Sequence, residues 1–372
     1  MIICLDLSQR TKDELDKLLE AGYRDYSEAV AVAIANQLLL HNRPTGDTQT
    51  IVFPEQESNW QPSEQKSGKP PLSRPTQVSS VPTHFSYSVN LTQDTKGWRF
   101  AHYPTDTLIA GQDVLVDRWI FGQHNKLLPA KATCRALALM MGSGLSGDFA
   151  LAKTASTIAS YAVQLGDYLR HLDATSGVHR DDALSFAFPH SDTPNNDKSR
   201  LRYANQFVAS LTTKGALAGL PFELKLLNKA DSRNPEILLT EAGWVFARLR
   251  NPILDDANDG SNGKFSNEEI EFLLSHIRSR VPAEAFAYKV VLEAIAQGAR
   301  TPDKLDDALE EYLPKREQKP FTRAFLTTQR AGVVSRMIDL GLLQRIRDGV
   351  NVTYMATAKT FEFSPNPLRQ VV

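Results

Sequence analysis

The chain has 372 residues, of which 42% are hydrophobic and 23% charged, and its net charge at pH 7 is −1. These values are typical of a soluble globular protein of two or three domains. No apolar run reaches the about 18 residues of a membrane-spanning helix. Two cysteines are too few for a disulfide framework or a zinc site. The near-neutral charge excludes a uniformly basic coat for nucleic acid but not local basic faces. Because the start lacks a signal-peptide pattern, we expect a cytoplasmic protein without membrane partners.

Residues 1–42 have the pattern of a strand followed by two short helices. Residues 2–7 alternate with a period of two, Ser8 and Ser27 are suited to cap helices, and Gly22 is suited to end the first one. A block this small cannot build its own core and needs a partner chain. Its "ICLDLS" and "GYRDYSEAV" resemble the ribbon-helix-helix (Arc/MetJ-type) superfamily, in which two chains pair their strands.

That resemblance implies a homodimer formed through residues 1–41. It also implies Ile2, Cys4 and Asp6 in the DNA major groove and Ser27 at a backbone phosphate. Ile, Cys and Asp are not base-reading residues, and the block carries four basic against seven acidic side chains, a local net charge of −3. We therefore expect dimerisation to be its main role. An unrelated helical hairpin is the alternative.

Residues 43–95 change in composition. Seven prolines stand there among Ser, Thr, Gln and Lys. Such a segment buries too little apolar surface to offset its ordering entropy. It is predicted to be a flexible linker.

Residues 96–252 are predicted to form a middle domain that begins with short strands and continues with helices from about residue 128. Its third helix is expected over 198–220. A strand, a polar turn, a strand and a helix follow, and "LLTEAGWVFA" resembles the end of many winged-helix regulators. On the third helix the pattern places Leu201, Ala204, Val208 and Leu211 inward and Lys198, Arg202 and Asn205 outward. The Asp/Asn/Gly-rich segment 251–264 is expected to end the domain.

Residues 265–363 are predicted to form the last domain. Helices are expected over 283–299, from Pro302 with Thr301 as cap, and up to Gly341. The pair Asp348-Gly349 between β-prone runs indicates a hairpin. Three helices and a hairpin resemble the winged helix. On the third helix the pattern places Val333, Val334, Met337 and Ile338 inward and Thr328, Gln329, Ser335 and Arg336 outward.

Two basic segments are candidate DNA contacts, because phosphate and base recognition need exposed cations and amides. In the last domain only Asp339 is acidic between residues 318 and 347. The alternative is that these arginines pair with the acidic helix "DKLDDALEE" at 303–311. The candidate residues are Thr328, Gln329, Arg330, Arg336, Arg345, Arg347, Lys319 and Arg323 in the last domain, Lys198, Arg200, Arg202 and Lys214 in the middle domain, and Ser27.

Three motifs imitate other sites. "GSGLSG" at 142–147 fits G-x-G-x-x-G, but helix formers precede it where a dinucleotide site needs a strand. "DDANDGSNG" fails as a calcium loop, because Ala257 and Ser266 stand at ligand positions. "RHLDATSGVHRDD" groups His171, Asp173, His179, Asp181 and Asp182; a metal site is possible there, and a solvated loop is favoured.

No catalytic motif is visible. H-E-x-x-H, G-x-S-x-G and Walker A sequences are missing, and Cys134 stands among Ala and Leu as a small buried apolar residue would. We therefore expect no enzyme, no cofactor and no metal.

Together these patterns predict a mainly α protein with small β-hairpins: a ribbon-helix-helix segment followed by two winged-helix-like domains. The predicted function is that of a dimeric prokaryotic transcriptional regulator that binds double-stranded DNA. The alternatives are an adaptor or DNA-recognition subunit of a multi-protein DNA-defence (antiviral), restriction or mobile-element complex, and a plasmid replication initiator.

Overall fold

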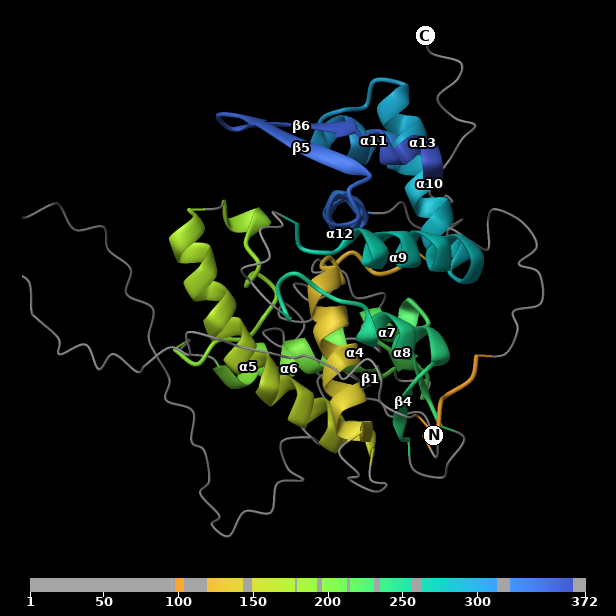
Figure 1. Cartoon of the computed structure of the whole chain (residues 1–372). Helices are drawn as coiled ribbons and strands as arrows, with labels where there is room; N and C mark the ends of the chain where they lie inside the picture. The colour runs from red at the N-terminus through yellow and green to blue at the C-terminus, as the bar shows by residue number, and fades with distance from the viewer. Residues whose placement is uncertain are drawn as a thin grey trace, which may run out of the picture.

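A computed structural model describes residues 95, 98–103, 119–142, 149–177, 179–192, 196–212, 215–230, 235–255, 263–312 and 322–363. The predicted ribbon-helix-helix segment and nearly all of the predicted linker lie outside these residues. The described part is mainly helical and contains three two-stranded antiparallel sheets (Figure 1). The expected class, mainly α with small hairpins, is confirmed for this part of the chain.

The middle unit, residues 98–255, is built on two long helices, α4 and α5. Residues 98–103 and 119–126 form no strand, so the strands expected there are not found within the described residues. The hairpin and helix expected after residue 220 are found as β3, β4 and α8, but the first residues of the expected strand form the short helix α7 instead. The elements are α4 (Leu127–Gly142), α5 (Leu151–Ser176), η1 (Arg180–Asp182), α6 (Asn196–Tyr203), η2 (Ala204–Val208), β1 (Ser210–Leu211), β2 (Leu217–Ala218), α7 (Leu220–Glu223), β3 (Leu227–Lys229), β4 (Ile237–Leu239) and α8 (Glu241–Arg248).

The third helix of the middle unit is shorter than predicted. The α-helix ends at Tyr203, continues as the short π-helix η2, and is followed by a small hairpin in which Ser210 pairs with Ala218. Gly215 explains the change, because its φ of 72° is favourable for glycine and closes the turn. Leu211, predicted to face inward, is consequently 43% exposed on this hairpin.

The C-terminal unit, residues 263–363, agrees closely with its prediction. A capping box between Ser266 and Glu269 starts α9, which precedes the three expected helices. The hairpin closes at Gly349, whose φ is 58°. The elements are α9 (Asn267–Arg280), α10 (Pro282–Ala296), α11 (Pro302–Tyr312), α12 (Arg323–Asp339), β5 (Leu343–Asp348), β6 (Asn351–Ala356) and α13 (Lys359–Phe363).

The two units share a connectivity. In each, backbone from between two successive helices, α4 and α5 or α10 and α11, bonds to the second strand of the later hairpin or to the residue just before it. In the middle unit Ala150 forms a bridge with Glu236, next to β4. In the C-terminal unit the Tyr354 N–H of β6 donates to the Arg300 carbonyl over 2.8 Å. Apart from α9 in the C-terminal unit and the segment from η2 to α7 in the middle unit, each runs helix, extended residue, helix, helix, hairpin.

The two units pack directly on each other, and α12 lies at the joint. A Cβ on Gly122 would lie 2.0 Å from the Thr328 carbonyl oxygen, and one on Gly332 would lie 2.4 Å from the Gly122 carbonyl oxygen. Only glycines allow the segment before α4 to approach the α12 backbone this closely. Buried hydrophobic residues of both units belong to one continuous core.

Candidate nucleic-acid interface

The predicted outward face of α12 is buried, so this part of the prediction is wrong. Arg336 has 0% exposure; its guanidinium donates to both carboxylate oxygens of Glu284, at 2.6 and 3.0 Å, and to the His124 carbonyl at 2.7 Å. Ser335 and Gln329 are also buried, and Thr328 is half-buried. Helical periodicity identifies the face toward the helix's own unit. It cannot show that a second unit covers the opposite face.

The other α12 arginines pair with the acidic helix α11, as the alternative expectation held. Arg330 is buried, and its Nε lies 2.6 Å from an Asp306 oxygen. Arg323 is about half exposed and lies 2.5 Å from Asp307 and 3.6 Å from Asp303. These cations are neutralised within the C-terminal unit, which leaves α12 poorly suited to enter a DNA groove.

The arginines of the β5–β6 hairpin face the middle unit. Arg345 lies 3.0 Å from Asp182 at the end of η1. Arg347 is half-buried on the same strand face, because side chains two residues apart in a strand share a face. The opposite face and the tip carry exposed apolar side chains: Ile346 at 39%, Met355 at 44% and Val350 at 97%.

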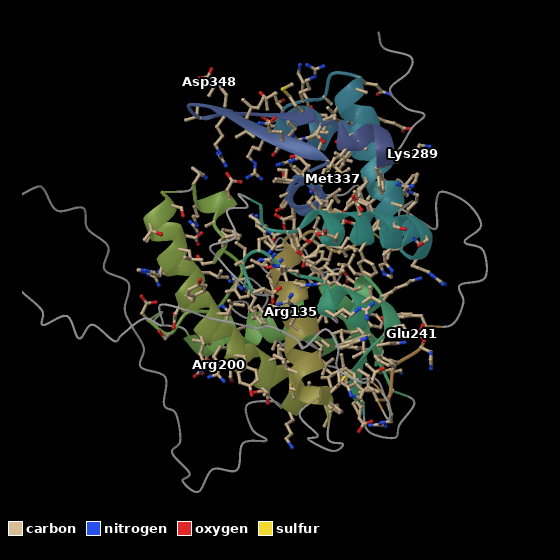
Figure 2. All side chains as sticks on the ribbon, in the orientation of Figure 1. Arg135, Arg200, Glu241, Lys289, Met337 and Asp348 are labelled. Carbon is tan, nitrogen blue, oxygen red and sulfur yellow. The ribbon has the colours of Figure 1, made fainter. Side chains whose placement is uncertain are left out.

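The basic face of α6 is exposed, as predicted. Lys198 and Arg202, one helical turn apart, are both exposed. Between them, Arg200 is half-buried; it donates to the Ser160 hydroxyl of α5 over 3.0 Å and lies 3.7 Å from Asp197. Figure 2 places Arg200 far from Asp348 at the hairpin tip. The remaining candidates Lys214, Lys319 and Ser27 lie outside the described residues.

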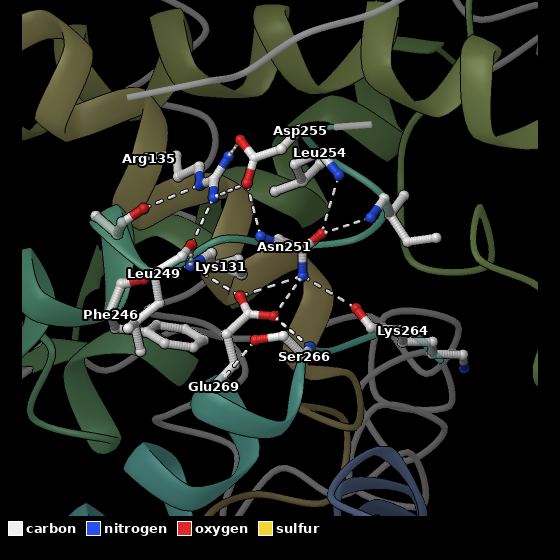
Figure 3. Close-up of polar contacts among 12 residues, drawn as sticks. Lys131, Arg135, Phe246, Leu249, Asn251, Leu254, Asp255, Lys264, Ser266 and Glu269 are labelled. Carbon is white, nitrogen blue, oxygen red and sulfur yellow. Dashed lines mark hydrogen bonds and ion pairs between the residues drawn. The ribbon is translucent and has the colours of Figure 1, made fainter. Parts of the chain in front are cut away.

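A buried polar network joins the two units at a place that the sequence patterns miss (Figure 3). Lys131 of α4 lies 2.8 Å from Glu269 of α9, and both side chains are fully buried. Arg135, one turn further along α4, pairs with Asp255. Asn251 is fully buried and donates to the Lys264 carbonyl and to Glu269 at 3.0 and 2.9 Å. The segment expected only to end the middle domain is thus part of the joint.

The network also caps a helix. Lys131 and Arg135 donate to carbonyls at the C-terminal end of α8, including that of Leu249 at 2.7 and 2.6 Å. Such carbonyls lack partners inside the helix, and cations there also complement the helix dipole. Burial lowers the pKa of Lys131 to about 8 and raises that of Glu269. In the sequence, the one sign of this network is that Lys131 and Arg135 stand four residues apart in an otherwise apolar helix.

The described residues hold no group of three or more His, Cys, Asp or Glu placed to bind a metal. In the segment weighed as a metal site, Asp173 instead accepts from the backbone N–H groups of Leu184 and Ser185, at 2.8 and 2.9 Å. Cys134 is fully buried, as predicted, and burial raises the pKa of its thiol to about 12. α4 precedes the glycine-rich 142–147 segment, so no strand leads into it.

Within the described residues no helix is long and apolar enough to cross a membrane. Comparison of the chain with protein-family models, with curated proteins and with solved structures finds no match. The case for a function therefore depends on the geometry of the chain itself.

Proposed function

We propose that this protein is a non-enzymatic, double-stranded-DNA-binding protein and that α6 is its principal DNA-contacting helix. In this proposal each unit is a winged-helix variant, and the N-terminal block pairs two chains into a dimer. The output would be that of a cytoplasmic transcriptional regulator.

The connectivity supports this architecture. In a winged helix the third helix faces DNA and a hairpin flanks it. By chain order α6 is the third α-helix of the middle unit, and α12 is the third helix of the C-terminal unit after the additional helix α9. Because the middle unit covers α12, α6 is the one of these two helices that a duplex can reach.

The exposed pair Lys198 and Arg202 carries the proposal. Two cations one turn apart on an exposed helix suit two phosphates, or a phosphate and a base edge. Asn205 follows on the next turn and is half-buried. On α12, by contrast, Arg336 forms an ion pair with Glu284 and Arg330 with Asp306.

The test is the salt dependence of DNA affinity. Fluorescence anisotropy of the full chain on a random duplex, across a salt series, is expected to give a steep slope, because each phosphate contact releases counterions. Replacing both Lys198 and Arg202 with Ala should weaken binding and reduce the slope by about 1.8, from two contacts at about 0.9 each. Lys289→Ala, an exposed lysine on α10 of the other unit (Figure 2), is the matched control.

Absence of duplex binding, or an unchanged slope in the double variant, would refute this proposal. Sizing of the full chain tests the dimer separately, since a monomer would remove the role proposed for residues 1–41.

A second candidate is an adaptor subunit of a larger assembly. The observation that favours it is the exposure of three apolar side chains on the β5–β6 hairpin: Ile346 and Met355 on its outer face, and Val350, which is 97% exposed, in its turn. Exposed apolar side chains suit a protein partner better than a phosphate backbone. This candidate leads if the full chain forms a stable dimer and shows no affinity for DNA.

A further inference from the structure

The exposed stripe of α6 continues beyond its two cations into η2. Lys198, Arg202 and Gln206 follow one another at intervals of four residues, and side chains spaced in this way share a face of a helix. The apolar side chains of η2 are buried, and Gln206 is half-buried. A neutral amide thus stands at the end of the cationic stripe.

The amide of Gln206 is held by a second amide, that of Gln123. The Gln206 Nε2 donates to the Gln123 Oε1 over 2.9 Å. Gln123 stands between two residues that α12 fixes. The Gly122 backbone packs against that of α12, and the His124 carbonyl accepts from Arg336 over 2.7 Å. The joint of the two units therefore sets the place of Gln123. A side chain oriented in this way loses little conformational entropy when it binds a ligand.

Gln206 keeps one donor and one acceptor for a ligand. A carboxamide has two N–H groups and one carbonyl oxygen. One N–H of Gln206 is used on Gln123, and in the described part of the chain its second N–H and its Oε1 hydrogen-bond to no other residue. In the major groove adenine presents the complement of this pair, because its N7 accepts and its N6 amino group donates. Guanine presents two acceptors there, N7 and O6, so it offers no donor to the amide oxygen.

We propose that Gln206 reads an adenine in the major groove and that Gln123 is its positioning residue. This inference rests on the proposed function, in which Lys198 and Arg202 bring α6 to the duplex. Contacts to phosphates place a protein on DNA without reading its sequence, whereas contacts to base edges specify the sequence. The stripe therefore joins two cations that supply affinity to one amide that supplies specificity.

The test selects duplexes from a random-sequence library with the full chain. The selected duplexes should share an A·T pair at one position. Anisotropy on such a duplex, and on one with G·C at that position, should show affinities that differ by about 5- to 150-fold, the discrimination of one bidentate contact. Gln206→Ala should bind the two duplexes equally and keep the salt slope, because its phosphate contacts are intact. Gln206→Arg should prefer guanine, since arginine donates to both N7 and O6. A merely structural contact of Gln206 would not produce this reversal.

Two further variants test the positioning. Gln123→Ala removes the partner amide and should reduce the preference for adenine without changing the salt slope; an unchanged preference would refute the positioning role. Gln344→Ala removes an exposed glutamine from β5 of the other unit and should leave the preference as it is. Circular dichroism checks that each variant is folded.

The outcomes separate this inference from the proposed function. Suppose that duplexes bind with a salt slope that depends on Lys198 and Arg202, while the wild type selects no adenine or Gln206→Ala keeps its preference. The inference is then refuted, and the proposed function stands. If no duplex binds, both are refuted. A preference for adenine that Gln206→Ala loses and Gln206→Arg reverses supports both.

Discussion

Removing Glu284 should reveal how strongly the buried face of α12 is held. Glu284 and Arg336 both have fully buried side chains and form a bidentate pair, with the third contact of Arg336 on the His124 carbonyl. Glu284→Leu leaves the arginine buried without its counter-charge, which costs about 3–5 kcal/mol of stability. At about 1.4 kcal/mol per factor of ten, the unfolding equilibrium constant should rise by roughly 100- to 4000-fold.

The measurement is urea unfolding followed by tryptophan fluorescence. The double variant Glu284→Leu with Arg336→Met should recover most of the loss, because well-packed apolar side chains can replace a buried ion pair at little cost. Glu293→Leu breaks the partly exposed Lys289–Glu293 pair on the same helix and should cost at most about 0.5 kcal/mol. If Glu284→Leu were as mild as that control, α12 would not be locked at the joint.

Two further predictions concern the same joint. Gly332→Ala inserts a methyl group against the Gly122 backbone and should lower the free energy of unfolding by about 1–3 kcal/mol. The control Ala331→Ser, on the exposed side of α12, should change that free energy by at most about 0.5 kcal/mol. Equal effects of the two variants would refute the close packing. Burial lowers the pKa of Lys131 from 10.5 to about 8, so the unfolded chain binds this proton more strongly between those values. Stability contributed by this group should therefore rise as pH increases from about 8 toward 10.5, and Lys131→Met should remove that rise in the urea midpoint.

The two units share a connectivity, but their packing on each other leaves α6 exposed and α12 buried. In the C-terminal unit α12 packs against the middle unit. In the middle unit the third helix stays exposed with Lys198 and Arg202. In the proposed function, α6 therefore contacts DNA, and α12 holds the two units together.

The sequence by itself determined the local elements of this protein. Apolar periodicity, Pro302 at a helix start and Asp348-Gly349 at a turn predicted α10, α11, α12 and the β5–β6 hairpin nearly to their ends. These signals are reliable because each depends on backbone conformation within a few residues. The exposure of Lys198 and Arg202 agrees with the prediction, since no other unit among the described residues covers that face of α6.

Only the tertiary structure decided what the charged residues do. Arg336, Lys131 and Asn251 are polar, and no pattern in the sequence identifies their partners. Yet all three are fully buried at the joint. A buried charge is stable only when a partner from elsewhere in the chain neutralises it, and Glu284 and Glu269 do so here. Pairing between residues so distant in the sequence leaves no periodic pattern, so the fold had to be known before the joint could be recognised.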